Sequence, residues 1–300
     1  MIEVKNVPLG SLLSEEEEKR IRQKLMEEYL ACPSAVKYIK SLGIPNELVE
    51  QNIDKISDMV RDINTCRRCP GISKCEKGSP RVITKILYRN GRITTELTPC
   101  KRVLERIDIL SQFKMTDFDL DWIGSELTNL DPSKGRKQAL MKYTMYSEDK
   151  SDQWLYLTGS QNSGRSFFAA TLTMDLARKK KGPICFINSP IRLKSLNSDS
   201  YNNKEKFAND FELLSSCPVL VIDDFGNEFK NDYGVLLQIL IKRSGKKLFT
   251  IFTSDYSMSE VAELYSASSK SNAIQAKRIL EILEKNCKKE INLGELPVYQ

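Results

Sequence analysis

Residues 154–177 read WLYLTGSQNSGRSFFAATLTMDLA, and this stretch decides the fold. A short apolar run is followed by a loop between two glycines and then by an amphipathic pattern, which is the order of a nucleotide-binding strand, loop and helix. Gly159 and Gly164 permit backbone torsions and close approach that side chains would block, so successive N–H groups point at a phosphate chain. The helix that follows adds the positive end of its dipole. We predict that eight residues bind the phosphates: Gly159, Ser160, Gln161, Asn162, Ser163, Gly164, Arg165 and Ser166.

Two side chains of this loop have specific expected roles. Ser166 is placed to bind Mg²⁺ through its hydroxyl group. Arg165 stands where the motif has lysine. A lysine is a compact point charge that reaches the β- and γ-phosphates, whereas a guanidinium is wider and planar. The substitution therefore predicts that ATP binds in an altered pose and is turned over less well.

A second phosphate-site element lies at residues 217–226, CPVLVIDDFG. A continuous β-branched run that ends in two carboxylates is typical of a buried parallel strand with acids at its carboxyl end. We expect Asp223 to hold Mg²⁺ and Asp224 to orient or polarise the attacking water. The alternative is a buried strand that ends in a solvated Asp-Asp turn, and the glycine loop upstream makes this alternative the weaker one.

Composition limits the class of protein. The 300 residues are 40% hydrophobic and 29% charged, which is typical of a soluble chain of one large domain or two medium ones. We find no long apolar stretch and no secretory signal, so we expect a cytoplasmic protein without membrane contact. The net charge of +6 permits nucleic-acid contact without requiring it. There is no histidine, which excludes histidine catalysis and histidine metal ligands, and the eight cysteines are not expected to form disulfides.

Up to about residue 64 the chain reads as helical. Ser14 and Glu17 form a capping box ahead of one helical segment. Residues 46–63 are predicted to form another helix, with Leu48, Ile53, Ile56 and Val60 along its apolar stripe. This pattern fits a small bundle with a solvated face, and the residues alone leave open whether the bundle also binds another protein.

Four cysteines gather in one region after this helical part. Cys66 and Cys69 form a C-x-x-C pair, Cys75 follows after a short turn, and Cys100 returns after two apparent strands joined by an Asn-Gly hairpin signal at 90–91. Thiolates from two such turns can surround Zn²⁺ tetrahedrally and stabilise so small a β unit. We predict a four-cysteine zinc site, with a metal-free knuckle and a redox dithiol as open alternatives.

After the phosphate loop, strand and helix patterns alternate. The predicted fold class is therefore α/β: a C-terminal P-loop domain with a parallel sheet flanked by helices, preceded by a mainly helical N-terminal domain with a small β zinc knuckle at 66–100. The last clear strand pattern, KLFTIFTSDY at 247–256, brings Asp255 to the edge of the sheet where a γ-phosphate would lie, although an N-cap or loop role fits equally. The predicted boundaries are 1–113 for the N-terminal domain, 114–150 for a linker and lead-in helix, and 151–300 for the nucleotide-binding domain.

The order of these features, with the strings YLTG, VLVIDDFG and FTSDY, resembles the bacterial helicase loaders of the DnaI type. The AAA+ core is also similar to that of DnaC and to the ATPase subunits of some transposition systems. The resemblance implies a cytoplasmic protein that delivers the hexameric, DnaB-type replicative helicase onto DNA in replication initiation and restart. It implies that the N-terminal domain binds the helicase and that the AAA+ domain binds ATP, Mg²⁺ and single-stranded DNA. Self-association stays open.

Three departures from the family pattern fall on the chemistry of hydrolysis, and Arg165 is the first. Asp255 stands where the family usually has a sensor Asn, which adds a negative charge beside the phosphates and is expected to weaken the ATP-bound state. Arg278 matches the first arginine of a segment whose second arginine, the expected finger, is replaced here by Ile282. The candidate catalytic residues are thus Asp224, Asp255 and Arg278, and we expect ATP binding with weak or lost hydrolysis.

A further departure lies in the cysteine knuckle. The histidine that ligates the metal in the family is absent here, and Cys75 is its proposed substitute.

Two other functions are alternatives to the helicase loader. One is a competent ATPase in which Arg165, with Arg243 or Arg278, takes over the missing roles. The other is a zinc-knuckle nucleic-acid-binding regulatory protein with a vestigial ATP site. Its affinity for DNA would fall steeply as the salt concentration rises and would not change when nucleotide is added. The scarcity of aromatic residues near the basic stretches argues against this last alternative.

Overall fold

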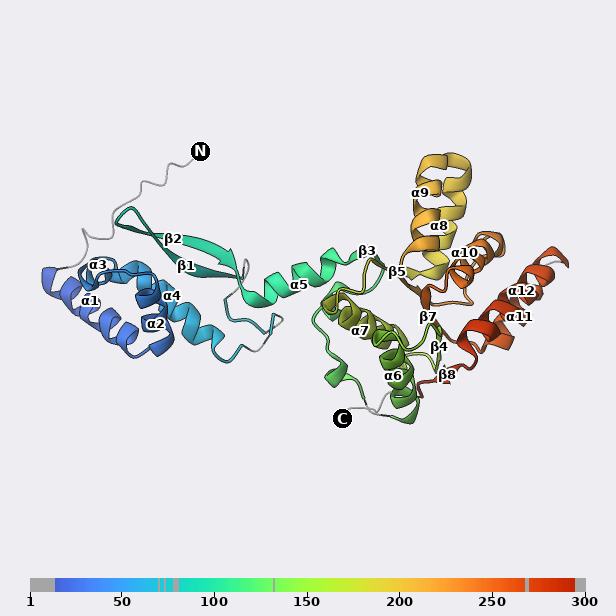
Figure 1. Cartoon of the computed structure of the whole chain (residues 1–300), viewed down its shortest axis with the longest axis horizontal. Helices are drawn as coiled ribbons and strands as arrows, with labels where there is room; N and C mark the ends of the chain where they lie inside the picture. Colours follow the sequence, from blue (N-terminus) through green and yellow to red (C-terminus); the bar gives the residue numbers. More distant parts are fainter. Residues whose placement is uncertain are drawn as a thin grey trace. The chain divides into compact units, whose positions relative to one another are not determined.

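Two units, Met1–Glu105 and Arg106–Gln300, make up the chain (Figure 1). The computed structural model describes residues 14–69, 71–72, 74–77, 81–131, 133–267 and 270–294. Among the described helices, none combines the length and apolarity that a membrane crossing needs.

The first unit packs helices around a small apolar core. Its helices are α1 (Glu15–Leu30), α2 (Pro33–Ser41), α3 (Asn46–Gln51) and α4 (Ile53–Cys66). The capping box at Ser14 and Glu17 is confirmed and begins α1. The single helix predicted over 46–63 is wrong, because the chain breaks at Asn52, whose side-chain amide donates to the carbonyl of Leu48 at 3.0 Å. Such a local bond competes with the helical backbone pattern.

An antiparallel hairpin completes the first unit. Strands β1 (Val82–Arg89) and β2 (Arg92–Pro99) pair in register, with Arg89 opposite Arg92. The turn residues have φ angles of 51° and 74°, the left-handed pair that a two-residue Asn-Gly hairpin requires, so the predicted hairpin is confirmed. Ile86 and Ile93 bury one face of the hairpin in the core that α4 lines. Three strands or a helix partner are normally needed to stabilise a hairpin, and α4 supplies that partner.

The second unit contains a six-stranded parallel sheet in the order β3-β5-β6-β7-β4-β8. The strands are β3 (Phe113–Thr116), β4 (Leu155–Thr158), β5 (Ile184–Asn188), β6 (Val219–Asp223), β7 (Phe249–Ser254) and β8 (Ile291–Asn292). The division between the two units falls within helix α5 (Lys101–Ser111). The other helices are α6 (Lys134–Ser147), α7 (Arg165–Arg178), α8 (Ser189–Asn202), α9 (Lys204–Ser216), α10 (Tyr233–Gly245), α11 (Met258–Ser266) and α12 (Lys270–Cys287), with 3₁₀ turns at Leu120–Trp122 and Leu127–Asn129. The predicted α/β class is confirmed for this unit.

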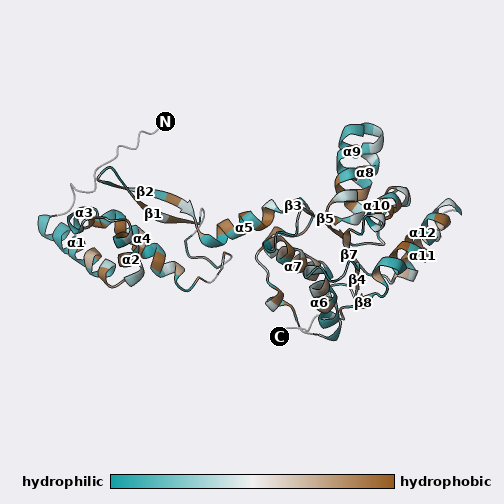
Figure 2. Cartoon of the chain, viewed as in Figure 1, coloured by the Kyte–Doolittle hydropathy of each residue, from teal (hydrophilic) through white to brown (hydrophobic). Residues whose placement is uncertain are grey.

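Helices cover both faces of the sheet, which explains why its strands are apolar throughout. Alternate strand residues point to opposite faces, so Leu155 and Leu157 pack with α7 while Tyr156 packs with α10 and α12. Figure 2 shows brown and teal alternating along α12, as expected of a helix with one face packed inward. Helix α7 is instead buried over most of its length.

The segment predicted as a linker, 114–150, contributes structure to this unit. β3 pairs with β5, and α6 buries Ala139 and Tyr143 in the core beneath α7. The functional domain boundaries themselves stay a prediction.

Candidate functional site

The loop between β4 and α7 has the backbone that a phosphate loop needs. Asn162 and Gly164 adopt left-handed conformations with φ of 66° and 74°, and α7 begins at the next residue. A Cβ atom on Gly159 would lie 2.6 Å from the Ser163 hydroxyl oxygen, so the turn has no room for a side chain there. The geometry fits a phosphate loop, and the assignment of residues 159–166 as nucleotide ligands stays a prediction.

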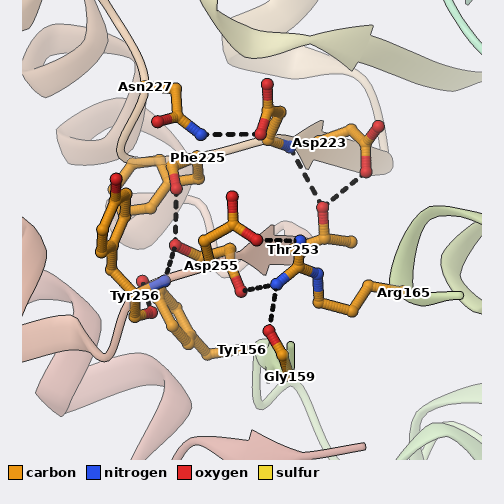
Figure 3. A network of polar contacts seen from close by, with 11 residues as sticks. Tyr156, Gly159, Arg165, Asp223, Phe225, Asn227, Thr253, Asp255 and Tyr256 are labelled. Carbon is orange, nitrogen blue, oxygen red and sulfur yellow. Dashed lines mark hydrogen bonds and ion pairs between the residues drawn. The ribbon is translucent and has the colours of Figure 1, made fainter. Parts of the chain in front are cut away.

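Ser166 and Asp223, the two predicted Mg²⁺ ligands, lie in contact. The Asp223 carboxylate accepts a hydrogen bond from the Thr253 hydroxyl on β7 (Figure 3). It also accepts one from the Ser166 hydroxyl. Burial raises the pKa of Asp223 above its ordinary value, and the two hydrogen bonds oppose this effect. Carboxylate and hydroxyl oxygens are the donors that Mg²⁺ prefers, so these residues fit the ion.

Asp224 turns the chain at the end of β6. Its φ of 61° is unusual for a residue other than glycine, and such strain is found at functional sites. Its backbone N–H donates to the Thr253 hydroxyl at 3.1 Å, and the Asn227 amide donates to its carboxylate at 2.7 Å. Thr253 therefore ties both acidic residues to β7. The role of Asp224 in orienting water stays a prediction.

Arg165 turns back onto protein groups. Its Nη1 donates to the carbonyl of Ser254 at 2.8 Å and to that of Gly159, and its Nη2 forms an ion pair with Asp255 (Figure 3). The two residues that depart from the family pattern at the phosphates are thus bonded to each other. The sequence pattern predicts a separate role for each residue and does not predict this pair.

Arg136 is a site residue that sequence reasoning missed. Its guanidinium is almost fully buried and donates to the backbone carbonyl of Ser163 in the phosphate loop at 2.7 Å. It also bonds Asp131 at 2.9 Å and the Ser133 hydroxyl at 3.2 Å. Arg136 thereby fixes the loop from α6. No local pattern marks such a residue, since its target lies 27 positions away along the chain.

The loop after β6 is held by a second residue without a sequence signal, Glu228. This buried carboxylate accepts hydrogen bonds from Ser189 on α8, Tyr265 on α11 and the backbone N–H of Gly226, the last at 2.8 Å. Burial raises its pKa. Glu228 therefore joins the acidic loop to two helices and limits its movement.

The arginine residues considered for the missing finger differ in position. Arg243 is fully buried and donates to the backbone carbonyls of Leu214, Cys217 and Phe249. The hypothesis that Arg243 replaces the finger is therefore wrong, because its guanidinium is enclosed within the protein and bonded to its backbone, where no phosphate reaches it. Arg278 is exposed on α12, and within the described part of the chain it makes no hydrogen bond or ion pair with the phosphate loop. Its catalytic role stays a prediction.

The described residues do not bring Cys66, Cys69, Cys75 and Cys100 together as a metal site. All four thiols are free, and no group of three or more Cys, Asp or Glu residues in the described ranges is placed to hold an ion. Burial raises the pKa of the Cys66 thiol, and the neighbouring Cys69 and Cys100 act in the same direction. The four-cysteine zinc site therefore stays a prediction.

Comparison with known proteins places the chain near the helicase loaders. No family model matches it. It is 23% identical over 252 residues to the replicative helicase loader DnaI of Bacillus subtilis (strain 168), across 79% of this chain and 80% of that protein. A crystal structure of DnaI shares 22% identity and a TM-score of 0.54, covering 61% of this chain and 97% of that one. A crystal structure of a putative primosome component from Streptococcus pyogenes serotype M3 shares 22% identity and a TM-score of 0.51, covering 64% of this chain and 98% of that one. The resemblance to DnaI-type loaders is confirmed.

The first prediction concerns the buried charge of Asp223. A carboxylate with a raised folded pKa stabilises the fold below its unfolded pKa, near 3.8, and this contribution is lost as the pH rises through the folded value. The change Asp223→Asn should therefore raise the melting temperature of the nucleotide-free protein at pH 8 by about 2 °C or more. The difference should shrink as the pH approaches 4, and binding of Mg-nucleotide should be lost.

Differential scanning fluorimetry at both pH values, with and without Mg-nucleotide, makes the measurement. Asp152→Asn is the matched control, since Asp152 is exposed and pairs only loosely with Lys247 at 3.7 Å. A lower melting temperature for Asp223→Asn at pH 8 would contradict the buried-charge argument.

The second prediction concerns Arg136. The change Arg136→Ala leaves the Ser163 carbonyl and Asp131 without their buried donor, so it should lower the free energy of unfolding of the second unit by about 2–4 kcal/mol. Denaturant titration measures this loss. Lys246→Ala, which removes a cation whose side chain is 52% exposed, should cost less than about 0.5 kcal/mol. Equal effects for both variants would remove Arg136 from the support of the loop.

Proposed function

We propose that this protein loads a hexameric, DnaB-type replicative helicase onto DNA in replication initiation and restart. The observation that carries the proposal is the extent of the similarity to the loader DnaI. The aligned 252 residues exceed the length of the second unit, so the similarity includes part of the first unit as well. A likeness confined to the nucleotide-binding fold would support a much wider range of functions.

In this proposal the first unit binds the helicase. It has a core of its own, so it can hold a partner independently of the phosphate loop. Large apolar side chains remain exposed on it, with Leu30 at 61% and Leu97 at 68%. Exposed apolar groups of this size are candidates for burial in an interface.

The second unit binds ATP with Mg²⁺, and single-stranded DNA, in the same proposal. Residues 159–166 would cradle the phosphates, and Ser166 with Asp223 would hold the ion, which supplies charge neutralisation to the phosphate chain when bound. Asp224, supported by Asn227, is the group available to orient water. Arg165 is engaged by Asp255, and Ile282 packs toward the core where the family has its finger. These features support weak or lost hydrolysis.

The third prediction is a stable complex between the full chain and the replicative helicase of its own organism. Size-exclusion chromatography with mass detection, with and without ATP, makes the measurement. If the site gates assembly, ATP should change the amount of complex formed by the native chain. The variant Asp223→Ala should form the same amount with and without ATP, because it lacks the carboxylate that holds Mg²⁺. Absence of a complex in every condition would reject the loader function.

The four-cysteine zinc site belongs to the same proposal and rests on the cysteine spacing alone. It predicts about one equivalent of zinc in the purified full chain, measured by elemental mass spectrometry. The change Cys69→Ser should remove the metal, whereas Cys32→Ser, which alters a thiol buried in the helical core, should leave it. Native protein without zinc would reject the site and favour the metal-free knuckle.

A further inference from the structure

The guanidinium of Arg165 is already occupied by an anion of the chain itself. In a phosphate loop the basic residue at this position reaches the β- and γ-phosphates of the nucleotide. Here the same group forms an ion pair with the Asp255 carboxylate at the end of β7 (Figure 3). The carboxylate thus lies where the basic residue would otherwise meet a terminal phosphate.

The pair is built into the site. The Arg165 side chain is only 12% exposed, and its Nη1 also bonds the carbonyls of Gly159 and Ser254, one in the phosphate loop and one on β7. Asp255 follows Ser254 directly, so its backbone is anchored by the pairing of β7 with β4. Exposed ion pairs hold long side chains weakly, but this guanidinium is fixed by three acceptors.

We propose that Asp255 acts as an internal substitute for the γ-phosphate, so that the site selects a nucleoside diphosphate over a nucleoside triphosphate. The inference rests on the proposed nucleotide-binding function and names the ligand class of that site. A diphosphate uses the loop N–H groups and the helix N-terminus, which the ion pair leaves in place. A triphosphate must bring its γ-phosphate beside Asp255 or break the pair.

Charge decides the size of this effect. The γ-phosphate and the carboxylate are both negative, and one guanidinium is shared between them. Like charges a few ångströms apart repel strongly in a partly buried site, where water screens them less than in bulk. A lysine and an asparagine at these two positions would instead leave the cation free for the phosphate, because an amide carries no net charge.

The experiment is a calorimetric titration of the full chain with Mg-ADP and with Mg-ATP. We expect the native protein to bind ADP about tenfold more tightly than ATP. The change Asp255→Asn should raise the affinity for ATP about tenfold and alter that for ADP less than about threefold. Asp255→Ser provides a second variant without the charge. The matched control, Asp152→Asn, removes an exposed carboxylate before the opposite end of β4 and should leave the ratio unchanged.

The outcomes separate this inference from the proposed function. A ratio of ADP to ATP affinity that is the same in the native chain and both Asp255 variants would overturn the inference while leaving the nucleotide site intact. No binding of either nucleotide by any of these proteins would overturn the nucleotide site and the inference together. A diphosphate preference without a helicase complex would uphold the inference and reject the loader function.

Discussion

The candidate site depends on the parallel pairing of β6, β7 and β4. Thr158 lies opposite Ser254, and Ile222 lies opposite Phe252, so the three strands end at one edge of the sheet. The residues that follow or end these strands, Gly159, Asp223 and Asp255, are brought together by this register alone. A shift of β6 by one residue would turn the Asp223 side chain to the other face of the sheet. Burial of both faces of the sheet prevents such a shift, because it would move the apolar residues with them.

Two buried guanidinium groups support the sheet, one at the carboxyl ends of the strands and one at the amino ends. Arg136 bonds the phosphate loop, and Arg243 bonds the backbone carbonyls of Leu214 near the end of α9, Cys217, and Phe249 at the start of β7. A buried charge is costly unless hydrogen bonds surround it, and both groups meet that condition. Arginine suits this task since its planar fork serves several carbonyls at once. These side chains thereby hold the phosphate loop and the ends of regular elements in place.

Sequence patterns predicted the features that are local. The strand, glycine loop and helix at 154–177, the hairpin turn and the capping box each follow from residues close together in the chain. The ion pair of Arg165 with Asp255 joins residues 90 positions apart, and the role of Arg136 depends on a carbonyl rather than on a side chain. No spacing rule reveals either. The polar segment 114–150 concealed β3, which has only four residues and is a strand because β5 pairs with it.

The ion pair also changes how the departures from the family pattern are understood. Read singly, an arginine for lysine and an aspartate for asparagine are two defects in an ATP site. Together they form a neutral pair, in which each charge is satisfied by the other. Reversing only the arginine to lysine would leave Asp255 facing a cation that cannot also bond two carbonyls in one plane. Reversing only the aspartate would free the guanidinium beside the phosphates. We therefore expect substitutions at the two positions to be energetically coupled, so that their separate effects do not add.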